Sequence, residues 1–181
     1  MSPAITPVET RHVSVEVGAA RLSMHVAGQG RPLVLFHSLL ADRSSFDRVL
    51  PALAATHTVH ALDLPGFDGS DFADGGLEAV ADRVAAGLRA LNLAQPPTLL
   101  GNGYGGFVAL LVALRAELAT VRVPALVLVG ELDEATPPPM SHELAAGLPD
   151  AKLVVLPGLA HVPQLQAPEQ FLPPVTAFLA A

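Results

Sequence analysis

The sequence has 181 residues, of which 51% are hydrophobic, and it carries a formal net charge of −7. A chain of this length can bury one hydrophobic core, so we predict a single domain over residues 1–181. The absence of cysteine excludes disulfides and thiolate chemistry, and an acidic chain without a basic stripe argues against nucleic-acid binding.

The longest unbroken apolar run covers residues 107–114, far short of the ~20 residues that a membrane-spanning helix needs. The first residues also lack the basic and apolar stretches of a signal peptide. We therefore expect a cytoplasmic location and no membrane partner.

The N-terminal stretch alternates apolar and polar residues over 12–17 and 21–26, which predicts two half-buried strands joined as a hairpin. The unbroken apolar run 32–36 predicts a central parallel strand, because such strands are buried on both faces. Apolar residues that recur every three or four positions over 77–91 indicate an amphipathic helix. Further strands are predicted at 58–63, 98–100, 125–129 and 151–156, and further helices at 46–53, 105–118, 141–146 and 168–179.

Strands thus alternate with helices from residue 32 onward. This alternation predicts an α/β fold with a doubly wound, mostly parallel sheet and an antiparallel N-terminal edge.

Residues 98–107 read TLLGNGYGGF, an apolar strand followed by a glycine-dense turn and a helix. This is the layout of the G-x-S-x-G nucleophile elbow, in which a sharp turn exposes a nucleophilic serine. The frame here runs from Gly101 through Asn102, Gly103 and Tyr104 to Gly105. Gly103 therefore stands where the serine would be.

Four other segments fit the same pattern in the expected order: FHSL at 36–39, DLPGFDGS at 63–70, GELD at 130–133 and GLAH at 158–161. On these motifs the chain, from residue 21 to its end, resembles the α/β-hydrolase superfamily. The resemblance is to its capped branch of 3-oxoadipate enol-lactonases and ring-cleavage hydrolases. Ser38 and Asp68 stand where that family has glycine.

The resemblance implies that His161 is the general base, that Asp133 fixes its tautomer and that Gly103 marks the nucleophile position. It places the oxyanion hole at the backbone amides of Leu39 and Tyr104. The pocket residues that it implies are His37, Ser38 and Asn102.

Several of these assignments have alternatives in the sequence. Glu131 and Glu134 are alternatives to Asp133 as the acid, and Ser38 is an alternative nucleophile. His37 is also a candidate turn residue that bonds to the backbone. The other histidines are predicted at the surface or at sheet edges: His12, His25, His57, His60 and His142. No histidine cluster has the spacing of a metal site, so we expect neither a metal nor another cofactor.

The largest departure from the family is a deletion. We infer that one strand and the helical cap are missing between the elbow helix and the acid-bearing strand, with the junction near residues 113–115. Either strand 125–129 moves beside strand 98–100 to fill the vacant slot, or a second chain donates a strand. Loss of the cap would expose an apolar pocket floor, which favours a homo-oligomer.

The leading functional hypothesis is a hydrolase for small esters, lactones or related carbonyl compounds. Its chemistry would be impaired, because without a serine His161 and Asp133 must activate water directly. One alternative is a non-catalytic scaffold that binds a small ligand or self-associates. Another is a cofactor-free oxygenase or lyase that uses the same histidine and aspartate.

Overall fold

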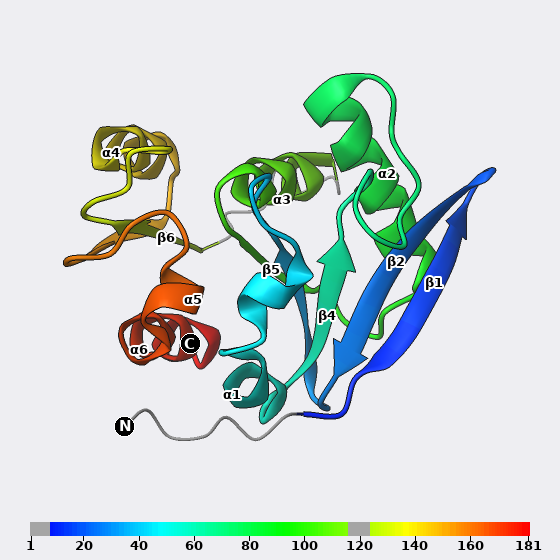
Figure 1. Cartoon of the computed structure of the whole chain (residues 1–181), viewed down its shortest axis with the longest axis horizontal. Coiled ribbons are helices and arrows are strands. Elements are labelled where there is room, and N and C mark those ends of the chain that lie inside the picture. The colour runs from blue at the N-terminus through cyan, green and yellow to red at the C-terminus, as the bar shows by residue number, and fades with distance from the viewer. Residues whose placement is uncertain (1–7, 116–123) are drawn as a thin grey trace. The chain divides into compact units, whose positions relative to one another are not determined.

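The structure is a computed structural model that describes residues 8–115 and 124–181. The chain divides into two compact units, Met1–Ala116 and Glu117–Ala181, which we call the N-terminal unit and the C-terminal unit (Figure 1). Within the described residues each unit has its own sheet. The expectation of a single domain over residues 1–181 stays a prediction.

The N-terminal unit is built on one sheet, whose strands among residues 8–115 lie in the order β1-β2-β4-β3-β5. They are β1 (Arg11–Val17), β2 (Ala20–Ala27), β3 (Arg31–Phe36), β4 (His57–Asp63) and β5 (Thr98–Gly101). β2 is antiparallel to β1 and β4, whereas β3 is parallel to β4 and β5. This arrangement confirms the predicted α/β fold with an antiparallel N-terminal edge.

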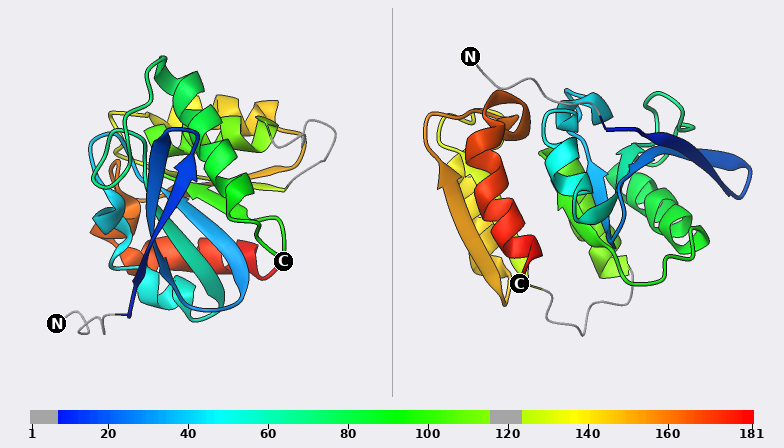
Figure 2. Two further views of the ribbon diagram at one scale, coloured as in Figure 1. Left: turned by 90° about the vertical axis from the view of Figure 1, so that its right-hand side faces the viewer. Right: turned by 90° about the horizontal axis from the view of Figure 1, so that it is seen from below.

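Helices cover both faces of this sheet. They are η1 (Arg43–Phe46), α1 (Leu50–Ala54), α2 (Gly76–Ala90) and α3 (Tyr104–Arg115). Figure 2 shows α2 and α3 side by side on one face and α1 on the other. The predicted helix 46–53 is two short elements, because Pro51 has no amide to donate and fits only the first turn of a new helix. Residues 116–118 of the predicted helix 105–118 lie outside the described residues, as does most of the segment after the predicted junction.

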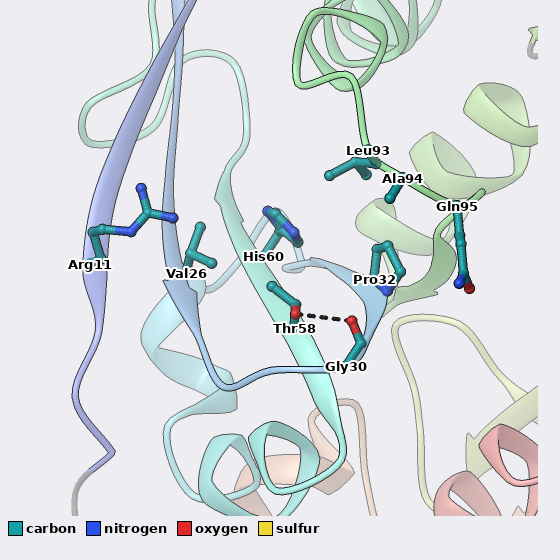
Figure 3. A pocket seen from close by; sticks show the side chains of 9 residues that line it. All are labelled: Arg11, Val26, Gly30, Pro32, Thr58, His60, Leu93, Ala94 and Gln95. Atoms are coloured by element: carbon teal, nitrogen blue, oxygen red, sulfur yellow. Dashed lines mark hydrogen bonds between the residues drawn. The ribbon is translucent and has the colours of Figure 1, made fainter.

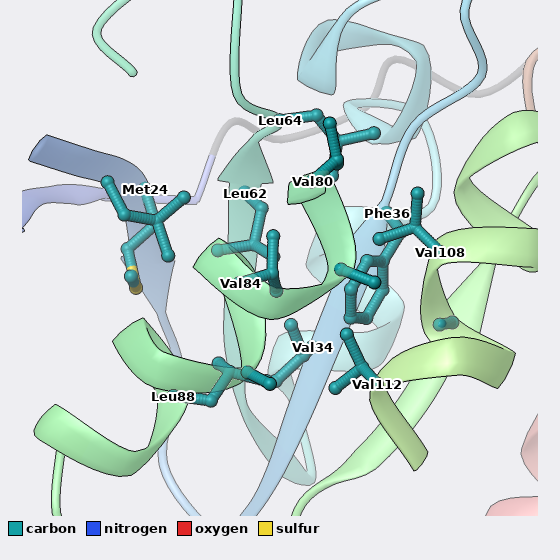
Figure 4. Packing of buried hydrophobic residues seen from close by; sticks show 14 of the residues in the cluster. Met24, Val34, Phe36, Leu62, Leu64, Val80, Val84, Leu88, Val108 and Val112 are labelled. Atoms are coloured by element: carbon teal, nitrogen blue, oxygen red, sulfur yellow. The ribbon is translucent and has the colours of Figure 1, made fainter. Parts of the chain in front are cut away.

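The main core lies between the sheet and the pair α2 and α3 (Figure 4). Val34 and Phe36 are two residues apart on β3, so both side chains point to the same face of the sheet. Val84 and Leu88 are four residues apart on α2 and share the helix face that covers them. The period-two and period-3.6 patterns in the sequence therefore meet in one cluster.

The C-terminal unit contains two parallel strands, β6 (Ala125–Gly130) and β7 (Ala151–Leu156). Its helices are α4 (Pro138–Gly147), α5 (Pro163–Gln166) and α6 (Pro168–Leu179). α4 and α6 lie on opposite faces of the strand pair (Figure 1). α4 begins earlier than the predicted helix 141–146, because its first-turn prolines have the dihedral angle that a helix start requires.

In the C-terminal unit the register brings Gly130 opposite Leu156, so the carboxyl ends of β6 and β7 lie together. Loops at this edge of a parallel sheet carry functional residues in α/β proteins. The predicted placement of strand 125–129 beside strand 98–100 concerns the two units together and stays a prediction. No helix among the described residues has both the length and the apolar character needed to cross a bilayer.

Candidate functional site

The site residues of the C-terminal unit lie in the two loops that follow β6 and β7. Gly130 ends β6 so close to the second loop that a Cβ there would collide with the carbonyl oxygens of Leu159 and Ala160. The loops are also joined by a hydrogen bond of 2.8 Å from the amide of Leu132 to the carbonyl of Leu159. This close approach needs glycine, and it places the residues after each strand side by side.

Asp133 and His161 form a hydrogen-bonded pair at this place. Nδ1 of His161 lies 3.0 Å from Oδ2 and 3.1 Å from Oδ1 of Asp133. The side chain of Asp133 is 5% exposed and that of His161 is 16% exposed. An ionised carboxylate only accepts hydrogen bonds, so Nδ1 carries a hydrogen, and the neutral form of this ring has its lone pair on Nε2. That tautomer is the one that a histidine general base requires.

Thr136 supports the carboxylate of Asp133. Its amide and that of Ala135 each donate to Oδ1 over 2.9 Å, and its hydroxyl donates to Oδ2 over 2.9 Å. Burial alone would raise the pKa of Asp133, but the hydrogen bonds from Thr136 and His161 outweigh burial and lower it. The sequence analysis did not identify Thr136, although an aspartate side chain often accepts a hydrogen bond from the backbone amide two residues further on.

Glu131, one alternative acid, has a different partner. Its Oε2 accepts a hydrogen bond of 2.9 Å from the amide of Gly158, which bends the second loop with a φ of +70°. Within the described residues it is Asp133, rather than Glu131 or Glu134, that is seen hydrogen-bonded to His161.

The N-terminal unit carries the predicted elbow between β5 and α3. Gly103 has a φ of +53°, in the left-handed region where a side chain is strained. The sharp strand-to-helix turn of a nucleophile elbow strains its central residue in this way. A Cβ on Gly101 would collide with the backbone of Gly105 and Gly106, so the turn is also closed too tightly for larger residues.

The elbow lies against the end of β3. The amide of Asn102 donates to the carbonyl of Phe36 over 3.0 Å, and a Cβ on Gly105 would collide with the carbonyl oxygens of Phe36 and His37. The two segments that contain Tyr104 and Leu39 are therefore neighbours. First-turn amides have no acceptor within their own helix, so the start of α3 is suited to bind an anionic oxygen.

His37 is fully buried and bonds to the backbone at both ring nitrogens. Nε2 accepts from the amide of Leu64 over 3.1 Å, so Nδ1 carries the hydrogen and donates to the carbonyl of Ser38 over 2.9 Å. Its ring also packs edge-on against Phe67, with ring centroids 4.6 Å apart. This geometry matches the turn role expected for His37. It also fixes the segment that leads to Leu39, which is 55% exposed.

Tyr104 and Ser38, the two hydroxyl-bearing residues beside this segment, are poorly suited to act as nucleophiles. Burial raises the pKa of the Tyr104 phenol, which keeps it protonated near neutral pH. Ser38 is 1% exposed, so its hydroxyl is out of reach of solvent.

The loop after β4 is held in place by hydrogen bonds and an ion pair. Asp63 accepts from the Ser23 hydroxyl over 2.9 Å and pairs with Arg43 at 3.1 Å, while the Ser70 hydroxyl donates to the Asp63 carbonyl over 2.5 Å. Asp68 has a φ of +38°, which explains why glycine suits this position and why aspartate, a residue that tolerates this region, can replace it. These contacts tie the loop to β2 and keep the carboxyl edge of the sheet in place.

The prediction that the remaining histidines lie at the surface or at edges is wrong for two of them. His57 and His60 are 7% and 6% exposed. Both lie on β4, which is a central strand covered on both faces. Isolated histidines give no sequence signal of burial, because burial here depends on the strand's place in the sheet.

Comparisons with known proteins agree with this fold. The sequence pattern of the alpha/beta hydrolase fold family matches residues 31–131. The chain is 41% identical over 86 residues to a pimeloyl-(acyl-carrier protein) methyl ester esterase of Neisseria meningitidis, a match that covers 47% of this chain and 32% of that protein. It is 40% identical over 118 residues to the dihydrolipoyllysine-residue acetyltransferase component of the acetoin cleaving system of Pseudomonas putida, covering 63% of this chain and 31% of that protein.

Among solved structures, a thermophilic esterase from Thermogutta terrifontis superposes with a TM-score of 0.80 at 20% identity. The superposition covers 94% of this chain and 98% of that chain, and at this identity it shows the fold. The matches to the curated relatives span about a third of their length.

Proposed function

The chain belongs to the alpha/beta hydrolase fold family, and we propose that it acts on small ester substrates through the pair Asp133 and His161. The observation that carries the proposal is the buried carboxylate held within 3.0 Å of Nδ1 of His161. This arrangement sets the tautomer in which Nε2 can take a proton. The esterases among the relatives support an acyl methyl ester as the substrate class, and lactones share the same carbonyl chemistry.

The reaction that we propose is attack by water, since Gly103 provides no hydroxyl. The water oxygen bonds to the ester carbonyl carbon while one water proton passes to Nε2 of His161. The resemblance to the family assigns stabilisation of the negative charge on the carbonyl oxygen to the amides of Leu39 and Tyr104 in the N-terminal unit. When the bond to the alcohol breaks, the proton passes from His161 to the leaving oxygen, giving an acid and an alcohol.

This route forgoes the acyl-enzyme intermediate, so we expect slow turnover. Oxyanion binding without a complete triad still gives roughly 10³–10⁴-fold acceleration over water.

We propose that the protein is not attached to a membrane, that it resides in the cytoplasm and that it forms a homo-oligomer through the uncovered apolar face.

A second candidate function is a non-catalytic ligand-binding scaffold. The observation that favours it is Gly103 itself, whose left-handed φ keeps the elbow turn but offers no nucleophile. A scaffold of this kind would bind an ester and return it unchanged.

The experiment that tests the proposal compares the chain with its Gly103→Ser, His161→Ala and Gly103→Ser/His161→Ala variants. Hydrolysis of a short acyl methyl ester is followed, together with labelling by a serine-reactive fluorophosphonate. We expect slow hydrolysis that His161→Ala abolishes, and labelling of Gly103→Ser that the double variant loses. The matched control is Gly106→Ser, which adds a serine one helical turn away, at a position where a Cβ has room, and should stay unlabelled.

The outcomes separate the candidate functions. Turnover that survives His161→Ala would remove the histidine from the mechanism. The scaffold would be favoured by two results together: the parent chain binds the ester for hours without forming product, and the Gly103→Ser variant is labelled.

A further inference from the structure

A pocket lies at the edge of the N-terminal sheet opposite to the elbow. It has a volume of about 250 Å³ and is lined by residues at the amino ends of β3 and β4, by Arg11 and by the loop before β5 (Figure 3). Ligand pockets commonly have volumes of about 300–1,000 Å³, so this one suits a ligand of few atoms. The elbow lies at the carboxyl ends of β3 and β5, so the two sites are separate.

The strand register builds the pocket floor. Arg11 on β1 is opposite Val26 on β2, and Val26 is opposite His60 on β4. Directly paired residues project from the same face of a sheet, so the three side chains form one row. Thr58 is two residues from His60 and shares that face. Figure 3 shows Leu93 above His60, and both residues line the pocket.

His60 is the unusual member of this row. The residue is 6% exposed, and neither ring nitrogen has a hydrogen-bond partner among the residues that the structure describes. Leaving a buried polar group unpaired is costly, and native proteins rarely do so without a reason such as a bound water or ligand. A half turn about χ2 exchanges carbon and nitrogen positions of the ring without changing its shape, so a nitrogen can be presented to the pocket.

The charge in the pocket points to the kind of ligand. Arg11 supplies a guanidinium. In the described part of the chain it is not seen in an ion pair with a carboxylate. Burial, and then the charge of Arg11, lower the pKa of His60, so the ring is neutral near pH 7 and keeps one N–H to donate. The Thr58 hydroxyl already donates to the carbonyl of Gly30 over 3.0 Å, so it has only lone pairs to offer.

We propose that this pocket binds the carboxylate of a short-chain aliphatic acid. Arg11 and the His60 N–H hold the carboxylate, and Val26 and Leu93 pack against the hydrocarbon part of the acid. Guanidinium and carboxylate are well matched in geometry and charge. The proposal goes beyond the hydrolase function and does not depend on it, since none of its residues belongs to the elbow or to the Asp133–His161 pair.

The test is a titration of the chain with propionate, followed by NMR of the histidine ring carbons and protons at constant ionic strength. We expect saturable shifts of the His60 signals. Changes at His57 should be smaller, because its Nδ1 is hydrogen-bonded to the Thr56 hydroxyl over 2.9 Å. Arg11→Gln should weaken propionate binding about tenfold or more, because a charge-assisted contact is lost. Arg31→Gln, an exposed arginine at the same edge of the sheet, is the matched control and should leave the affinity unchanged.

Arg11 is exposed, so its variant should fold, and a loss of binding there cannot be attributed to unfolding. Propionamide, which has the same shape without the charge, should not saturate the His60 signals. Absence of saturation by propionate, equal weakening by both arginine variants, or equal binding of propionamide would each overturn the proposal.

Discussion

Nδ1 of His161 lies within hydrogen-bond distance of both carboxylate oxygens of Asp133, at 3.1 Å from Oδ1 and 3.0 Å from Oδ2. The two residues are brought together by parallel strands whose carboxyl ends share one edge. Because the carboxylate is buried and held by three further hydrogen bonds, its position does not depend on His161 alone. The pair is therefore preorganised, as a base and its orienting acid must be.

Thr136 is expected to hold the Asp133 carboxylate in this orientation. Thr136→Val removes the hydroxyl bond to Oδ2 while nearly keeping the side-chain volume. We expect the pKa of Asp133 to rise and the free energy of unfolding to fall by about 1–2 kcal/mol. Following the His161 Nδ1–H resonance by proton NMR as the pH is lowered reports the protonation of Asp133, and urea unfolding measures the change in stability.

Two further variants control for a general effect of losing a hydroxyl. Thr136→Ser keeps the hydroxyl and should restore the parent resonance. Thr176→Val removes an exposed hydroxyl that, in the part of the chain that the structure describes, donates to two carbonyls of its own helix at 2.9 and 3.2 Å, and it should leave the resonance unchanged. If Thr176→Val moved the resonance as far as Thr136→Val does, the positioning role would be refuted.

Gly105 and Gly106 are adjacent glycines with opposite expected responses to alanine. A Cβ on Gly105 would collide with the carbonyl oxygens of Phe36 and His37, so Gly105→Ala should lower the free energy of unfolding by about 1–3 kcal/mol. The nearest atom to a Cβ on Gly106 is 3.6 Å away, an ordinary contact, and alanine favours a helix by about 0.5–1 kcal/mol over glycine. Urea unfolding of both variants checks the difference; similar losses would show that the elbow is not packed as described.

His60 should make stability depend on pH. Burial and Arg11 lower its pKa in the folded state below the ordinary 6.5, so between these two values the unfolded chain binds a proton that the folded chain does not. Its full contribution is therefore present above pH 6.5 and is lost as the pH falls from 6.5 toward the lowered value. His60→Gln should reduce this slope of the free energy of unfolding against pH.

His142→Gln, at an exposed position of α4, is the control for the loss of a histidine and should keep the parent slope. His25 and His57 also have lowered pKa values, chiefly through burial, so some slope should remain in His60→Gln. An unchanged slope in His60→Gln would mean that the ring is solvated.

Local patterns in the sequence were enough to predict the strands and the elbow, but not the bounds of every helix. Alternation over 12–17 and the apolar run over 32–36 predicted β1 and β3, because the side-chain period of a strand is written directly into the order of residues. The glycines at 101, 103 and 105 marked the elbow: a Cβ on Gly101 or Gly105 would collide with nearby backbone, and Gly103 has the positive φ that glycine adopts without strain. The order of the motifs resembles that of the α/β-hydrolase superfamily, and this resemblance predicted the pair Asp133 and His161.

Tertiary structure decided which of these groups touch and how. Asp133 and His161 are 28 residues apart in the sequence, and their contact, like the support from Thr136, depends on the meeting of two loops at a sheet edge. His60 looked like an edge residue, yet it is buried because β4 lies between β2 and β3, a place in the sheet that follows from long-range pairing. A sequence records the chemistry of each residue and its near neighbours, whereas burial and partners between distant segments arise only when the chain packs.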